Sequence, residues 1–93
     1  MKIAVSLLAL AAAILEVMDV FSTYHMLARG GREQNPLVLW FMHTLGEAWP
    51  VCKLPELAVI AIVWALVPRP IALVCLSLMV AVYAYVVWHN YQI

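Results

Sequence analysis

Two long apolar runs, one at each end of the chain, dominate its pattern of hydrophobic and polar positions. The first covers about residues 2–29 and is closed by Gly30 and Gly31, which a helix interior disfavours. The last covers about residues 70–89, after a short proline-containing link. A helix needs roughly 20 apolar residues to cross about 30 Å of hydrocarbon. The pattern therefore predicts a transmembrane helix at each end of the chain.

Turn signals divide the middle of the chain into two further elements. Asn35 followed by Pro36 combines a preferred N-cap with a proline at the first helical position, so we expect a helix over residues 36–48. This helix measures roughly 18 Å and is too short to cross the bilayer. We therefore expect it to lie at the interface or to enter the membrane and return. A full span is expected over residues 51–67, between Pro50 and Pro68.

These elements predict an all-α integral membrane protein with a single domain over residues 1–93. It has three transmembrane helices, at about 2–29, 51–67 and 70–89, plus one short interfacial or re-entrant helix after Asn35 and Pro36. Small residues that allow close contact between helices are Ala9, Ala12, Ala13, Ala81 and Ala84.

Composition excludes most soluble functions. Of the 93 residues, 68% are hydrophobic and only 11% are charged. A soluble domain of this size buries only about 60% of its surface, so this chain would expose large apolar patches to water. Five basic and five acidic residues balance and leave no electrostatic footprint for nucleic acid. The expected partners are the lipid bilayer and other membrane helices, with no nucleic acid.

Several ionisable side chains fall inside the apolar runs, where each costs about 2.5–3.5 kcal/mol to insert. Helical spacing places Glu16, Asp19 and Thr23 on one face of the first helix. The long side chain of Lys53, at the start of the next span, can bring its ammonium to Asp19. Glu56, one turn further on, can share that ammonium. We therefore expect a direct ion pair between Asp19 and Lys53.

Glu16 has no evident partner in the chain, because it lies deeper in the span than Lys53 can easily reach. We expect it to be protonated or to meet another subunit. Two interpretations of the polar residues stay open. They hold thin helices together where no hydrophobic effect operates between helices, or they lie on a path for protons or cations.

No motif indicates catalysis or a bound cofactor. The serines lack a G-x-S-x-G context, and glycine-rich phosphate loops are absent. Side chains of metal-ligand type occur without the usual ligand spacing, at His25, Glu33, His43, Cys52 and His89. We therefore expect a protein that is not an enzyme and that has no metal site and no cofactor.

The order of the polar motifs is distinctive. D-x-x-x-T lies at residues 19–23, G-x-x-E-x-N-P at residues 30–36, and a membrane lysine at position 53. This pattern resembles a family of short prokaryotic integral membrane proteins known only as a domain of unknown function, DUF5658. The resemblance extends from about residue 15 to 89 and implies the three-span layout in a prokaryotic cell membrane. That family often has asparagine where this chain has Glu16.

The candidate site is a polar cluster drawn from the span, the turn and the last helix: Glu16, Asp19, Thr23, Glu33, Asn35, Lys53, Glu56 and His89. We interpret the protein as a non-enzymatic small membrane protein, a homo-oligomer or an accessory subunit of a larger complex, in which this cluster stabilises helix packing. The alternative is a small oligomeric transporter or channel that uses Glu16 and Asp19 for protons or cations.

Overall fold

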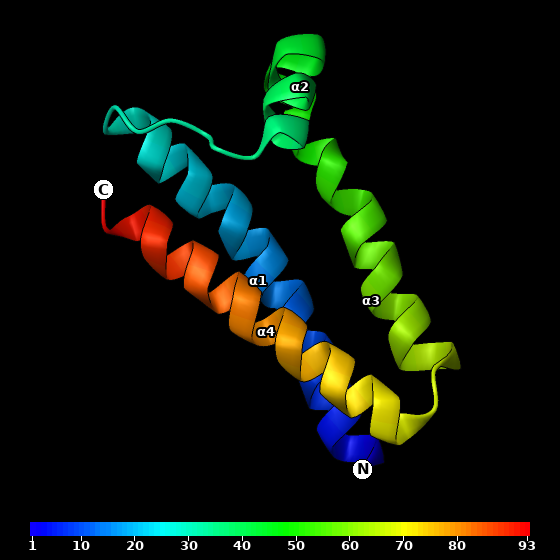
Figure 1. The fold of residues 1–93 in the computed structure, drawn as a ribbon. Coiled ribbons are helices and arrows are strands. Elements are labelled where there is room, and N and C mark those ends of the chain that lie inside the picture. The colour runs from blue at the N-terminus through cyan, green and yellow to red at the C-terminus, as the bar shows by residue number, and fades with distance from the viewer.

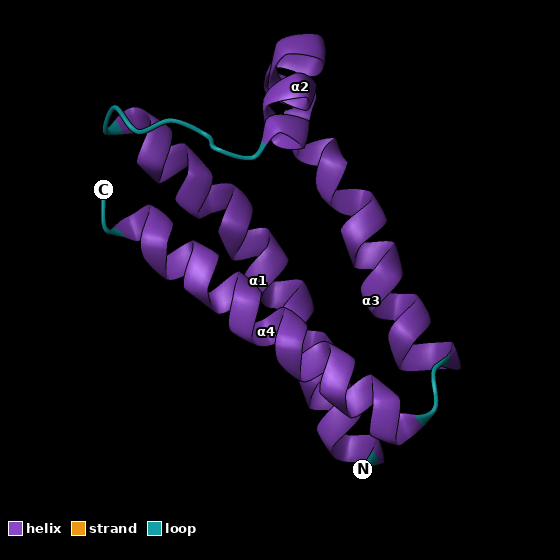
Figure 2. Ribbon diagram, in the orientation of Figure 1, coloured by secondary structure: helices purple, strands orange, loops and turns teal.

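The computed structural model describes all 93 residues and contains no strands. Its elements, shown in Figure 1 and Figure 2, are α1 (Lys2–Ala28), α2 (Pro36–Leu45), the 3-10 helix η1 (Gly46–Lys53), α3 (Leu54–Leu66) and α4 (Arg69–Tyr91). Three helical stretches are long and apolar enough to cross a membrane: α1, Pro36–Leu66 and α4. The prediction of an all-helical chain with three such stretches is confirmed.

Helix α1 ends where the sequence places its pair of glycines. The N–H of Gly30 donates to the carbonyl of Leu27, and the N–H of Gly31 donates to the carbonyl of Met26 at 2.9 Å. Gly30 has φ of 85°, in the left-handed region that favours glycine. The chain therefore leaves the helix axis here and turns toward α2.

The middle of the chain differs from the prediction. Helix α2 begins at Pro36 as expected, but it ends at Leu45 rather than near residue 48. Gly46, with φ of 58°, ends the α-helix, and η1 follows with no intervening loop. The prediction of a short helix that is separate from three complete spans is therefore wrong. Residues 36–48 are instead the beginning of one bent helical stretch, Pro36–Leu66.

The predicted full span over residues 51–67 is also corrected. Regular α-helix begins only at Leu54, and α3 contains 13 residues, a length of about 20 Å. Pro50 lacks the N–H that an α-helix interior requires, and the segment around it adopts the tighter 3-10 geometry. Pro55 is compatible with the first turn of α3, where an N–H has no helical partner.

Helices α1 and α4 run side by side in the same direction (Figure 1). Helix α3 runs in the opposite direction, from the end near α2 to the link before α4. A small apolar core joins the three helices, formed by Val5, Ala12, Ile60, Ala72 and Leu76. The small side chains of Ala12 and Ala72 are fully buried there, and Ala12 is one of the alanines predicted to allow close helix contacts. Ala81 and Ala84 are exposed and make no close helix contact within the chain, so for these two alanines contact with another subunit's helix stays a prediction.

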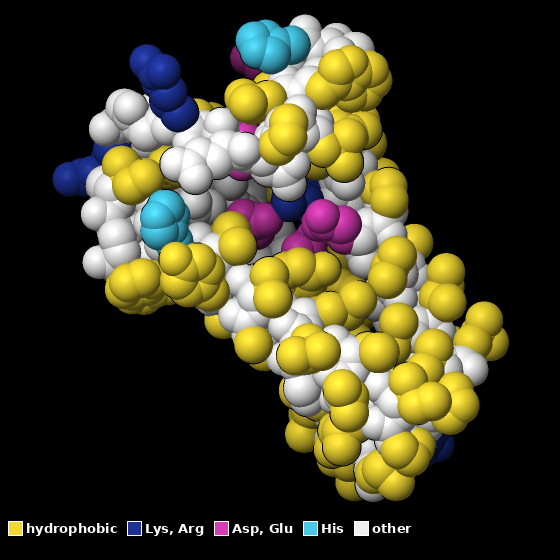
Figure 3. Space-filling view, in the orientation of Figure 1, with side chains coloured by type: hydrophobic (Ala, Val, Ile, Leu, Met, Phe, Trp, Pro, Cys, Tyr) yellow, Lys and Arg dark blue, Asp and Glu magenta, His cyan; other side chains and the backbone are white.

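The outer faces of the helices are apolar. Leu10 and Phe21 of α1 and Val74 and Leu78 of α4 are among many large hydrophobic side chains that are more than half exposed. In Figure 3 such side chains cover the part of the molecule around the amino terminus and the link between α3 and α4. The apolar core thus occupies one end of the molecule, and the polar side chains described next occupy the other.

Candidate functional site

An ion pair links α1 to the end of η1. The Nζ of Lys53 lies 2.7 Å from Oδ2 of Asp19, and the two side chains are only 12% and 11% exposed. Lys53 Nζ also lies 3.5 Å from Oε2 of Glu56, one turn later in the chain. The predicted contact between Asp19 and Lys53 is therefore confirmed, as is the sharing of the ammonium with Glu56.

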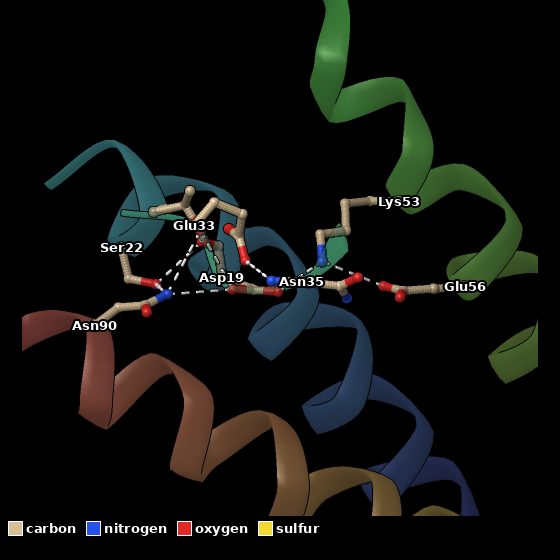
Figure 4. A network of polar contacts seen from close by, with 8 residues as sticks. Asp19, Ser22, Glu33, Asn35, Lys53, Glu56 and Asn90 are labelled. Carbon is tan, nitrogen blue, oxygen red and sulfur yellow. Dashed lines mark hydrogen bonds and ion pairs between the residues drawn. The ribbon is translucent and has the colours of Figure 1, made fainter. Parts of the chain in front are cut away.

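Hydroxyl and amide groups complete the surroundings of Asp19. Ser22 and Thr23 donate their hydroxyls to the carbonyl of Asp19, at 3.0 and 2.7 Å. From α4, the Asn90 amide Nδ2 lies 3.1 Å from the Ser22 hydroxyl and 3.5 Å from Asp19 Oδ1. Figure 4 shows Asp19 between Asn90 and Lys53, so this one carboxylate connects α1 with both other helical stretches.

The sequence prediction missed two members of this network. Ser22 lies three residues after Asp19, on the same helical face as Thr23, and that spacing could have identified it. Asn90 is adjacent to the predicted His89, and adjacent residues on a helix point about 100° apart. His89 is exposed, stacks on the Tyr85 ring with centroids 6.0 Å apart, and makes no hydrogen bond to the network. The amide of Asn90 takes the place in the network that the sequence suggested for His89.

Glu33 and Asn35 organise the turn before α2. The carboxylate Oε1 of Glu33 accepts from the backbone N–H of Asn35 at 3.0 Å, and Oδ1 of Asn35 accepts from the N–H of Leu37 at 3.0 Å. Asn35 is thus the N-cap of α2, as its position before Pro36 predicts. Neither side chain hydrogen-bonds to the ion pair, so these two residues shape the boundary of the site.

Glu16 lies one helical turn before Asp19 and differs from it in every contact. Its side chain is buried, with the residue 1% exposed, and neither carboxyl oxygen has a hydrogen-bond partner. No N–H or O–H donates to Glu16, and the polar side chain that adjoins its carboxyl is the carboxyl of Glu56. Oε2 of Glu56 also lacks a hydrogen bond, although it is within ion-pair distance of Lys53.

A cavity of about 450 Å³ brings the predicted residues together. Figure 3 shows acidic and basic side chains inside a hollow, with hydrophobic side chains around it. All eight members of the predicted polar cluster border this cavity: Glu16, Asp19, Thr23, Glu33, Asn35, Lys53, Glu56 and His89. The sequence prediction did not include five further polar residues that border it: Arg32, Gln34, Tyr83, Tyr85 and Asn90.

A second cavity of about 230 Å³ lies beside the first. Glu16 and Lys53 border both, and the remaining lining of the second is apolar, formed by Val17, Val20, Phe21, Pro50, Leu54 and Leu57. The buried carboxyl and the ammonium therefore stand between a polar cavity and an apolar one.

The side chains at the site are mainly charged and polar groups. The carboxyl groups of Asp19 and Glu56 contact the ammonium of Lys53, and the carboxyl of Glu16 borders the same cavity, which leaves an acidic excess around this ammonium. No group of three or more His, Cys, Asp or Glu side chains is arranged to hold a metal ion, and both cysteines are free. An acidic site of this kind can bind a proton or a cation.

Comparison with known proteins gives a family without an activity. A family model described as "Domain of unknown function (DUF5658)" matches residues 2–93. The matched region includes the whole ion-pair network and every residue that borders the two cavities. No curated protein and no solved structure matches the chain.

Proposed function

The chain belongs to the DUF5658 family, a domain of unknown function, and we propose that it is a non-enzymatic, multi-pass integral protein of a prokaryotic cell membrane. It acts as a homo-oligomer or as an accessory subunit of a larger membrane complex. Its polar cluster stabilises the packing of its helices. The observation that carries the proposal is the Asp19–Lys53 ion pair, which joins segments 34 residues apart in the sequence.

The dimensions and surface of the molecule support a membrane location. Its longest extent is 42 Å, close to the roughly 40–45 Å thickness of a bilayer with its interfaces. Helix α1 with 27 residues and α4 with 23 measure about 40 and 35 Å, enough to cross. Lipid solvates exposed apolar faces of this kind at no cost, whereas water does not.

The polar cluster supplies what an apolar interface between helices lacks in lipid. Hydrocarbon is as apolar as the helix faces, so packing and hydrogen bonds must hold the helices together. The α1–α4 pair has its own close contacts, but α3 diverges from that pair toward α2 (Figure 1). Lys53, at the end of η1, attaches this diverging end to Asp19 of α1.

A double-variant cycle in detergent tests the packing role. We expect Asp19→Leu and Lys53→Met each to lower the thermal stability sharply, because removing one member of a buried pair costs roughly 3–5 kcal/mol. The double variant should recover much of the loss, since no buried charge is then left unpaired. Lys2→Met, at an exposed lysine outside every ion pair, is the control that should change little. Simple additivity of the two losses would contradict the proposal.

Transport of protons or cations is the second candidate function. The observation that favours it is Glu16, a buried carboxyl without a hydrogen-bond partner that borders both cavities. Ionisable groups without partners inside membranes commonly mark ion or proton paths. Three helices cannot enclose a polar path alone, so this function requires several copies of the chain.

A further inference from the structure

Glu16 has no task in the packing of the helices. The ion pair uses Asp19 and Lys53, and the hydrogen bonds of the network reach Ser22, Thr23 and Asn90. Glu16 is 1% exposed, neither of its carboxyl oxygens accepts from an N–H or O–H donor, and its carboxyl adjoins that of Glu56 at the larger cavity. A buried polar group without a partner costs about 1–3 kcal/mol. Such a group at the wall of a cavity indicates that a ligand completes its contacts.

The charges around Glu16 favour a positively charged ligand. Lys53 Nζ donates to Asp19 at 2.7 Å, so these two charges neutralise each other. Glu56 keeps an oxygen without a hydrogen bond, 3.5 Å from Lys53, and Glu16 has no donor at all. Arg32, the other lysine or arginine that borders the cavity, belongs to the turn after α1. In the sequence it follows Asp19, whereas Glu16 precedes Asp19. The inner part of the cavity therefore has two acidic groups available for a positively charged ligand.

The size and lining of the cavity select an organic cation. A volume of about 450 Å³ lies in the range of small-molecule sites, about 300–1,000 Å³. Trp49, Tyr83 and Tyr85 border it, and aromatic faces attract ammonium groups. Val82 and Val86 add apolar surface for the uncharged part of a ligand. An ammonium group attached to an apolar body matches both kinds of wall.

We propose that this cavity binds a small organic ammonium ion. The charged nitrogen lies between the carboxyl groups of Glu16 and Glu56, and the apolar body packs against Trp49 and Tyr83. The site goes beyond the packing role, because it uses Glu16, which takes no part in the ion pairs, together with Glu56, whose Oε2 lies 3.5 Å from Lys53 and has no hydrogen bond.

The depth of Glu16 favours a free amine over a lipid headgroup. Glu16 lies about 18 Å along α1 from its end at Ala28, counted at 1.5 Å per residue. In the membrane arrangement of the proposed function, which this step requires, lipid headgroups lie at the level of that helix end. A headgroup amine would have to enter the hydrocarbon region to reach Glu16.

Equilibrium dialysis of the full chain in neutral detergent tests the site, with 2-phenylethylamine as the probe and protein-free micelles as the blank. We expect saturable binding of the amine and none of 2-phenylethanol, which has a similar shape but no charge. Glu16→Gln and Glu56→Gln should each weaken amine binding by roughly tenfold or more, because each removes a charged partner. Glu47→Gln is the matched control, since Glu47 is exposed and borders neither cavity.

Three results would overturn the proposal: equal binding of the alcohol, unchanged amine binding in folded Glu16→Gln, or displacement of the amine by phosphatidylethanolamine but not by phosphatidylcholine. The last would assign the site to a lipid headgroup. If Glu16→Gln does not fold, Glu56→Gln provides the same comparison. The Glu56 side chain is 42% exposed, so its substitution disturbs the fold less. Absence of saturable amine binding by the parent chain, together with an intact Asp19–Lys53 coupling, would likewise refute the ligand site and leave the packing role standing.

Discussion

Two acidic side chains on one face of α1 show how position decides the role of a carboxyl group. Asp19 contacts Lys53 from η1 and Asn90 from α4, so its charge is compensated on both sides. Glu16, one turn earlier, is buried more completely and meets neither group. The difference follows from position along α1. The side chains of Lys53 and Asn90 reach the level of Asp19, and neither donates to Glu16 one turn earlier. In the proposed function Asp19 therefore stabilises the packing, and Glu16 is the residue that we propose to contact a ligand or a proton.

Substitution of Glu16 separates the two candidate functions at the scale of one residue. Glu16→Gln keeps the size of the side chain and removes no hydrogen bond, so thermal stability should stay within about 1 kcal/mol of the parent chain. The transport function predicts in addition that proton or cation flux into liposomes is lost in this variant. Flux that is equal in Glu16→Gln and in the parent chain would contradict a transport role for this residue.

Glycine and proline control the elements in the middle of the chain. Gly46 turns the chain at the end of α2, and Pro50 keeps the following segment in a 3-10 helix until Leu54. As a result α3 is too short to cross a bilayer by itself, and the second apolar stretch relies on η1 for part of its length. The same bend places Lys53 at the junction where its side chain reaches Asp19.

The start of α2 depends on one side chain. Asn35→Ala removes the acceptor for the N–H of Leu37 and should cost roughly 1 kcal/mol of helix stability. Faster hydrogen exchange at the first turn of α2 is the expected local signature, and thermal unfolding gives the global effect. Gln34→Ala is the control, because Gln34 is exposed and makes no hydrogen bond through its side chain. Equal effects of the two variants would contradict the capping role.

The whole molecule separates an apolar end from a polar end. The core around Val5, Ile60 and Leu76 lies toward the amino terminus and the link between α3 and α4. The polar cavity lies toward α2, the preceding turn and the last turns of α4. In a membrane this arrangement places the dry core near one face and opens the polar cavity toward the other.

Labelling of single cysteines tests this arrangement in the membrane. With Cys52 and Cys75 replaced by serine, Arg32→Cys and Glu47→Cys should both react with a membrane-impermeant thiol reagent from the same side. Arg69→Cys, in the link at the opposite end, should react from the other side. Reaction of positions 32 and 47 from opposite sides would contradict the three-span topology.

The sequence by itself determined the features that depend on local spacing and on solvent. Apolar runs indicated three helical stretches and determined the first and the last, Gly30 and Asn35 marked two helix ends, and the residue spacing in α1 placed Glu16 and Asp19 on one face. It also predicted the Asp19–Lys53 pair, because few charges occur in the runs and each needs a partner.

Only the tertiary structure decided which side chains meet across helices. The rotation of α4 about its axis selected Asn90 over the adjacent His89, and packing between the helices set that rotation. The extent of the 3-10 segment, the exposure of Ala81 and Ala84, and the two cavities beside Glu16 follow from the same packing. These features depend on the relative placement of segments far apart in the chain, which a periodic pattern within one segment does not encode.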